Sequence, residues 1–137
     1  MQLHTYLNYG GNCEDAFKFY EQHLGGKITM MMRHGDQPGG EAPPELKGKI
    51  LHARISLGGT ELLGADTPPD RFQPIRSAYL SLTFDTNQQT DRVFALLSDG
   101  GQIFMPMQET FFASRFTMLR DKFGTSWMLI CPKPQNA

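Results

Sequence analysis

An internal repeat limits the folds open to this chain more than any other feature of its sequence. When the sequence is shifted by 75 residues, its halves match at apolar, capping and turn positions. Further along, the matching shift becomes 65 residues, so the first half holds ten extra residues. A fixed internal period predicts two copies of one supersecondary unit. The matched pairs are Leu7 and Leu82, Asn12 and Asn87, Phe19 and Phe94, Gly25-Gly26 and Gly100-Gly101, Ile28 and Ile103, Met30 and Met105, and Gly59-Thr60 and Gly124-Thr125.

Each half reads as a strand, a helix and three further strands. In the first helix the apolar residues recur at steps of three and four, Asn12 is the expected N-cap, and Gly25 ends the helix. In the second half, Thr86 or Asn87 caps a helix that ends at Gly100. We expect one α+β domain, 1–137, built of a first βαβββ module at 1–66 and a second at 76–132. Strands are predicted near 3–9, 27–33, 49–57, 60–65, 78–84, 102–107, 114–120 and 126–131.

The ten extra residues belong to the stretch HGDQPGGEAPPELKGK, which is rich in Gly, Pro and charge and has no apolar periodicity. It predicts a mobile surface loop at 35–48 without a counterpart in the second half.

Charge and cysteine spacing exclude several classes of protein. The net charge is −1 and the basic residues are scattered, which is not the pattern of a nucleic-acid-binding surface. No apolar run approaches the roughly 20 residues that cross a bilayer, so we expect a cytoplasmic protein with no membrane or nucleic-acid partner. Cys13 and Cys131 lack a CxxC spacing and are expected to be buried thiols.

Strand alternation separates an apolar face from a polar one in each module. In KILHARISL, the side chains of Leu51, Ala53, Ile55 and Leu57 oppose those of His52, Arg54 and Ser56; in LHTYLNY, Leu3 and Leu7 oppose His4, Tyr6 and Asn8. A plain solvated face is one interpretation, and a curved sheet that lines a polar pocket is the other. Tyrosine, histidine and a single arginine favour the pocket. The candidate pocket residues are His4, Tyr6, His52, Arg54, Tyr79, Ser81 and Met128.

Four segments in order carry a family resemblance: YLNYGGNCEDAFKFY, ILHARISLGGTELLGAD, QETFFASRF and DKFGTSWMLIC. Together with the repeat, they resemble the vicinal oxygen chelate superfamily of glyoxalases, bleomycin-resistance proteins and dioxygenases. Within it they resemble the PhnB-like branch, also labelled demethylubiquinone methyltransferase-like. The resemblance implies a U-shaped mixed sheet around a pocket, helices outside, and a homodimer with either intact or swapped modules. The methyltransferase label implies a nucleotide pocket, but the Gly-Gly pairs follow helices or sit in hairpins, so we do not expect methyl transfer.

Metal-dependent members of the superfamily take ligands from the first and last strand of each module. The resemblance carries these positions to His4, Leu63, Tyr79 and Met128. A divalent metal needs three or four good donors, and this set has one, so no metal or other cofactor is expected. His52 and Glu61 are replacement candidates, but a cation beside Arg54 would be repelled. His4 is then either a hydrogen-bonding pocket residue or a structural histidine.

Two classes of function follow. The first is a metal-free protein that binds a small organic molecule. The alternative is a glyoxalase- or dioxygenase-type lyase or isomerase for a small carbonyl or anionic metabolite, with His4 and His52 as acid and base. The missing carboxylate pair counts against glyoxalase-type proton transfer. Arg115 is left as either a surface charge or a pocket wall.

Overall fold

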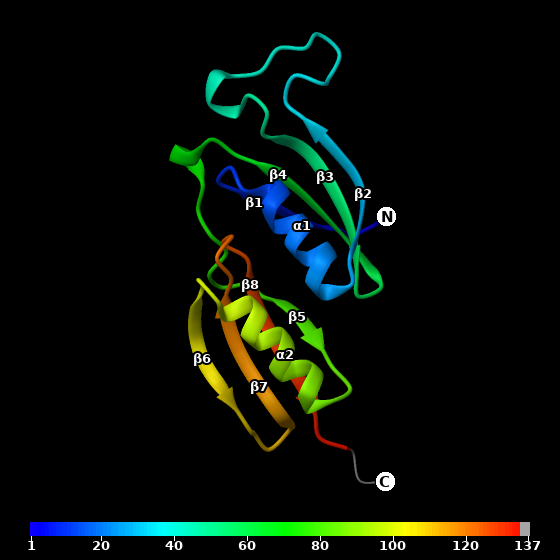
Figure 1. Cartoon of the computed structure of the whole chain (residues 1–137), viewed down its shortest axis with the longest axis vertical. Coiled ribbons are helices and arrows are strands. Elements are labelled where there is room, and N and C mark those ends of the chain that lie inside the picture. The colour runs from blue at the N-terminus through cyan, green and yellow to red at the C-terminus, as the bar shows by residue number, and fades with distance from the viewer. Residues whose placement is uncertain (135–137) are drawn as a thin grey trace. The chain divides into compact units, whose positions relative to one another are not determined.

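The computed structural model describes residues 1–134, which belong to two compact units, Met1–Gln73 and Pro74–Ala137. We call these units the first and the second module. Each contains a four-stranded mixed sheet and one helix of 12 residues, in the order strand, helix and three strands (Figure 1). The predicted α+β class and the pair of βαβββ modules are therefore confirmed.

The first module has the strand order β1-β4-β3-β2. Strands β1 and β4 are parallel, while β3 is antiparallel to both of its neighbours. The parallel pair joins the ends of the module, because β1 and β4 are its first and last strands. The elements are β1 (Thr5–Tyr9), α1 (Cys13–Leu24), β2 (Lys27–Arg33), β3 (Ile50–Leu57) and β4 (Thr60–Asp66), with short 3₁₀ turns at Pro44–Leu46 and Pro69–Arg71.

The second module repeats this plan with the strand order β5-β8-β7-β6, and again its first and last strands are parallel. Its helix begins after Thr86, whose side-chain oxygen accepts a hydrogen bond from the Gln89 backbone N–H at 3.1 Å. The elements are β5 (Leu80–Thr83), α2 (Asn87–Ser98), β6 (Gln102–Gln108), β7 (Ala113–Arg120) and β8 (Ser126–Pro132).

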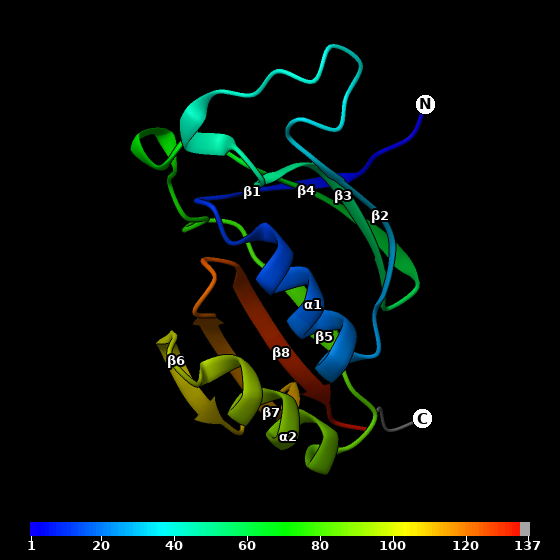
Figure 2. The same ribbon diagram turned by 45° about the horizontal axis from the view of Figure 1, so that its top comes forward.

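Each helix covers one face of its own sheet (Figure 2). Helix α1 buries Cys13, Ala16, Phe17 and Tyr20 completely, as the spacing of the apolar residues predicts. Burial of a large apolar side chain contributes about 1.5–3 kcal/mol, so this stripe fixes the helix on the sheet. Cys13 and Cys131 are buried free thiols, as expected.

The opposite sheet face is the one that positions the candidate residues. Ala53 and Ile55 are fully buried, whereas Arg54 between them is exposed, so β3 alternates as predicted. The prediction for the first strand was wrong at its start. Strand β1 begins at Thr5, and Leu3 is 96% exposed instead of sharing the buried side with Leu7. A residue outside the strand has no sheet neighbour to cover it.

The loop between β2 and β3 carries the extra residues of the first module, and it has no equivalent between β6 and β7. Its side chains bond within the loop, since Gln37 accepts from the Gly35 N–H at 2.7 Å and donates to the Glu41 carbonyl at 2.6 Å. Leu46 is buried and anchors its second half. Its mobility remains a prediction.

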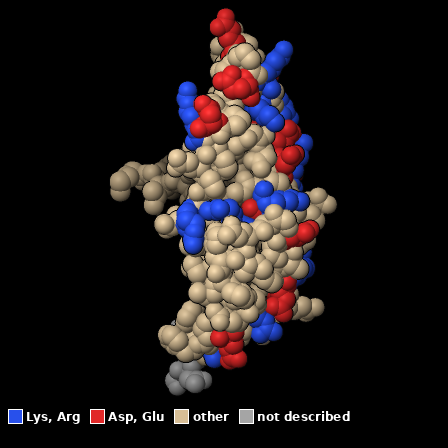
Figure 3. All heavy atoms as spheres, turned by 90° about the vertical axis from the view of Figure 1, so that its left-hand side faces the viewer, with Lys and Arg blue, Asp and Glu red and all other residues tan. Residues whose placement is uncertain are grey.

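Charged side chains of both signs lie interspersed on the face of the molecule shown in Figure 3. In the described part of the chain, no helix is both long and apolar enough to span a bilayer.

Candidate functional site

The sheet face opposite α1, here called the open face of the first module, brings together four side chains from three strands. Tyr6 of β1 pairs with Leu63 of β4, which pairs in turn with Arg54 of β3. Since paired residues of neighbouring strands point to the same side, Tyr6 and Arg54 flank Leu63. His52 lies two residues before Arg54 and Glu61 two residues before Leu63, so both reach the same face.

These side chains are in contact. The Tyr6 and His52 rings stack with centroids 5.9 Å apart and an interplanar angle of 29°. The Tyr6 hydroxyl lies 3.5 Å from His52 Nδ1, and Arg54 Nε lies 3.4 Å from His52 Nε2. Arg54 Nη1 is 3.4 Å from Glu61 Oε1. The result is a continuous polar chain from Tyr6 to Glu61 across the sheet.

Of these four side chains, Tyr6 and Arg54 are exposed, and His52 and Glu61 are half-buried. Partial burial, and secondarily the nearby Cys13, raise the pKa of the Tyr6 hydroxyl, which keeps it protonated as a hydrogen-bond donor or acceptor. The Arg54 side chain is 46% exposed, and its contact with Glu61 is longer than a strong charge-assisted hydrogen bond. Its guanidinium therefore retains donors for another partner.

His4 does not belong to this cluster. It precedes β1, is exposed, and its Nε2 lies 3.4 Å from Gln2 Oε1. The sequence placed His4 on the polar side of a strand starting at residue 3, but strand pairing begins only at Thr5. His4 therefore has no strand partner to orient it.

The other three candidates lie in the second module. Ser81 of β5 pairs with Met128 of β8, which pairs with Met118 of β7, so these side chains share the sheet face opposite α2. Tyr79 lies just before β5, and its hydroxyl accepts a hydrogen bond from Arg76 Nη1 at 2.9 Å. The sequence left two interpretations for Arg115, a surface charge or a pocket wall. Its Nε donates a hydrogen bond to Asp91 of α2 at 3.0 Å, so its charge lies on the helix side of the sheet.

The donor set does not fit the metal that the fold family implies. The ligand-equivalent positions offer one imidazole, one neutral phenol, one thioether and one alkyl side chain, at His4, Tyr79, Met128 and Leu63. Within residues 1–134, no three His, Cys, Asp or Glu side chains gather closely enough to hold a metal ion. We therefore propose no metal-dependent reaction for this protein.

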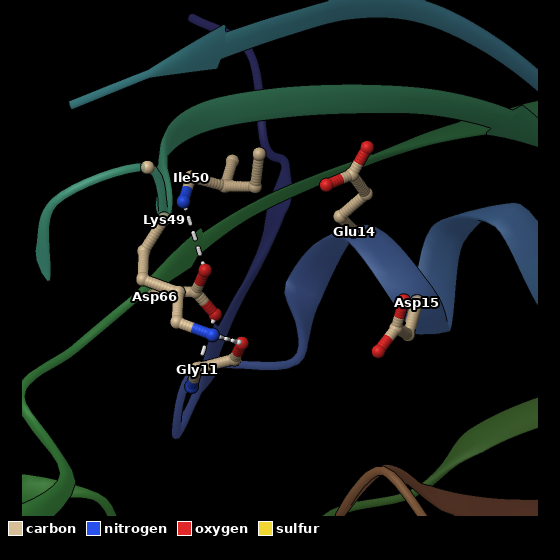
Figure 4. Close-up of a pocket in the computed structure, with 7 residues that line it drawn as sticks. Gly11, Glu14, Asp15, Lys49, Ile50 and Asp66 are labelled. Atoms are coloured by element: carbon tan, nitrogen blue, oxygen red, sulfur yellow. Dashed lines mark hydrogen bonds between the residues drawn. The ribbon is translucent and has the colours of Figure 1, made fainter. Parts of the chain in front are cut away.

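The role of Asp66, the last residue of β4, was not predicted from the sequence. Its buried carboxylate accepts from the backbone N–H groups of Gly11 at 3.1 Å and Cys13 at 2.9 Å through Oδ1, and from Ile50 at 2.8 Å through Oδ2 (Figure 4). Asp66 thus caps α1, whereas the side chain of the expected cap, Asn12, makes no such bond. The visible signal was an acid directly after the apolar run LLGA.

A small hollow of about 110 Å³ lies beside Asp66 and the start of α1. Lys49 Nζ donates to the Gly11 carbonyl at 3.0 Å on one side of it, and the Glu14 carboxylate is held by Arg33 and Lys18. None of the seven candidate residues lines it. Because Asp66 and Glu14 already hold partners around the start of α1, we interpret this hollow as part of the structural support of that helix.

Comparison with known proteins assigns the chain to a family. Residues 1–130 match the sequence profile described as 3-demethylubiquinone-9 3-methyltransferase. The chain belongs to this family. Protein YjdN of Escherichia coli K12 is 30% identical over 98% of both chains. The crystal structure of protein PA1353 from Pseudomonas aeruginosa is 38% identical, covers 98% of this chain and 99% of that chain, and has a TM-score of 0.86.

Two further structures extend the comparison, one to the PhnB-like branch and one to the fold of the superfamily. The PhnB protein of Bacillus cereus is 29% identical, with 96% of this chain and 99% of that chain covered and a TM-score of 0.83. A glyoxylase/bleomycin resistance protein/dioxygenase domain from Frankia has a TM-score of 0.65 at 16% identity, covers 97% of this chain and 98% of that chain, and so shows the shared fold alone. The resemblance stated from the sequence is therefore confirmed.

Proposed function

We propose that this chain binds a small organic molecule through the open face of the first module, without a catalytic metal. The observation that carries the proposal is the contact chain of Tyr6, His52 and Arg54 on that face. These side chains combine an aromatic surface with donors and acceptors, which is the usual composition of a site for small ligands. Tyr79, Ser81 and Met128 are proposed as ligand contacts of the second module on its own sheet.

The proposed chemical class of the ligand follows from the contacts of Arg54. Its guanidinium meets Glu61 only at 3.4 Å, and the neighbouring imidazole of His52 is neutral or positive. A ligand carboxylate or polarised carbonyl offers a better acceptor, because charge-assisted bonds to a guanidinium are shorter and stronger. The proposed ligand is therefore anionic or carbonyl-bearing. As the family resemblance implies, we also propose a homodimer, which light scattering on the purified protein tests by its mass.

A thermal-shift screen of organic acids and carbonyl compounds tests this function. Ligands that stabilise the wild-type protein should bind Arg54→Leu about tenfold or more weakly, since a charge-assisted bond contributes about 1.5–3 kcal/mol. Arg115→Leu is the matched control, because it removes the same charge from a strand on the helix side. Equal binding by wild type and Arg54→Leu would show that the open face of the first module is not the site.

A further inference from the structure

A second cluster lies in the second module, and it is assembled around a single carbonyl group. The Ile75 carbonyl oxygen accepts hydrogen bonds from Ser126 Oγ at 2.6 Å and from Arg120 Nη2 at 3.0 Å. Ser126 and Arg120 are register partners on β8 and β7. These two bonds fix the segment before β5 on the sheet, and they place the next residue, Arg76, beside Arg120.

Both guanidinium groups lie close to the ring of Phe104. The Cζ atom of Arg76 lies 4.1 Å from the ring centroid, and that of Arg120 lies 5.2 Å from it. The Tyr79 ring packs edge-on against Phe104 at 6.4 Å, while its hydroxyl accepts from Arg76. Phe104 sits at the register shift between Ile103 and Met105, and such bulges redirect a side chain.

The positive charge of this cluster is not balanced within its module. In the described residues from 74 onward, the ion pairs join Arg115 to Asp91 and Lys133 to Glu109, and neither Arg76 nor Arg120 takes part. Arg120 Nε is buried and has no hydrogen-bond partner there. A buried charged donor without an acceptor is costly, and two neighbouring cations repel each other. One negatively charged acceptor beside the guanidinium groups would offset the repulsion between them.

We propose that Arg76 and Arg120 form a binding site for an oxyanion, a phosphate or a carboxylate group, with Phe104 and Tyr79 as its aromatic walls. Guanidinium groups present planar donors that match the oxygen atoms of such anions. The proposal goes beyond the proposed function, because all four of its residues belong to the second module. It does not depend on Arg54, so the two can be tested separately.

The test is a calorimetric titration of the purified protein with inorganic phosphate, with chloride used to hold the ionic strength constant. The site predicts saturable binding whose Kd rises about tenfold or more in Arg76→Gln, which removes an exposed side chain and leaves the bonds to Ile75 intact. Arg120→Lys should weaken binding similarly, because it keeps the charge but loses the planar donors. Arg115→Gln is the control and should change the Kd by less than about twofold.

Parallel titrations with glycerol 3-phosphate and succinate show whether the site prefers inorganic phosphate, an organic phosphate or a carboxylate. Tighter binding of glycerol 3-phosphate than of inorganic phosphate indicates a group on an organic ligand. Binding of succinate alone indicates a carboxylate at this site only if it is weakened in Arg76→Gln and kept in Arg54→Leu. No saturable binding of any of the three, or equal affinity in wild type and Arg76→Gln, would overturn the oxyanion site. If the oxyanion site fails in this way, loss of organic-acid binding in Arg54→Leu would still support the proposed function. In the converse result, phosphate binding depends on Arg76 while no compound in the thermal-shift screen binds the protein. That result would refute only the proposed function.

Discussion

At the scale of single residues, Glu14 shows how one carboxylate joins a helix to a strand. Both of its oxygens accept from the Arg33 guanidinium of β2 at 2.7 Å, and Lys18 pairs with it one turn along α1. The hydrogen bonds from Arg33, and then those from Lys18, lower the pKa of Glu14 from 4.5 to about 2. A bidentate pair fixes direction as well as distance, so Glu14 orients α1 relative to the edge of the sheet.

The substitution Glu14→Gln should lower the free energy of unfolding at pH 7 by about 1 kcal/mol, since solvent screens these partly exposed pairs. The folded pKa is lowered, so the stabilisation is complete above pH 4.5 and disappears as the pH falls toward about 2. Urea unfolding of both proteins between pH 7 and pH 2 measures this difference.

Asp15→Asn is the control for that experiment, because it removes a carboxylate from the same helical turn and leaves the Arg33 and Lys18 pairs in place. A difference between wild type and Glu14→Gln that stays constant down to pH 2 would contradict the ion-pair explanation.

Residue roles that depend on distant neighbours were not visible in the sequence. Asn12 stands where an N-cap is expected, but the carboxylate that caps α1 comes from Asp66, more than fifty residues later. Likewise, the sequence predicted that Tyr6, His52 and Arg54 lie on polar strand faces, whereas the contact of Tyr6 with His52 follows from the pairing of β1 with β4. Alternation and spacing predict the side on which a residue lies, but partners also depend on which strands become neighbours.

At the scale of elements, the repeated Gly-Gly pairs show why the two modules share one architecture. Gly25 and Gly100 both have φ of 74°, the left-handed conformation that ends each helix. Gly26 and Gly101 then begin the approach to the next strand. A Cβ on Gly101 would overlap the Arg120 carbonyl oxygen of β7, whereas one on Gly26 would meet the end of the Ile55 side chain at 2.9 Å.

Gly101→Ala should therefore destabilise the protein by about 2–3 kcal/mol, because backbone atoms of a central strand cannot move aside cheaply. Gly26→Ala is the matched control at the equivalent position, and it should cost about 1 kcal/mol or less, since Ile55 can change its rotamer. Chemical denaturation of the two variants and the wild type measures both values. A larger loss in Gly26→Ala than in Gly101→Ala would refute the argument from close packing.

The elements themselves were predictable because their signals are local. The apolar stripes, the helix-ending glycines and the alternation in β3 each occupy a few adjacent residues. The bulge at Phe104 and the late start of β1 were not predictable, since both depend on where pairing with a neighbouring strand begins or shifts. For that reason the Arg76–Phe104–Arg120 cluster could not be predicted from the sequence.

At the scale of the whole molecule, the modules have the same order of elements but different side chains at equivalent positions. Asp66, which supports α1, corresponds to Cys131 in the second module, and His4 corresponds to Tyr79. The packing of helix on sheet is therefore the same in both modules, whereas the sheet face opposite each helix carries different side chains. The first face carries Arg54 and His52, and the second carries methionines in register beside Arg120.

This divergence predicts that the purified protein carries no stoichiometric Zn, Ni, Fe or Mn. Of the four ligand-equivalent positions, only His4 offers a donor that binds these ions strongly, and one imidazole is too few for a tetrahedral or octahedral site. Elemental analysis of protein purified without chelators measures the content directly. His4→Ala is the companion variant and should leave both the metal content and the thermal midpoint almost unchanged, because His4 is exposed and its ring lies within hydrogen-bond distance of the exposed Gln2. One tightly held metal ion per chain that disappears in His4→Ala would show that His4 is a metal ligand and would contradict the proposal of metal-free binding.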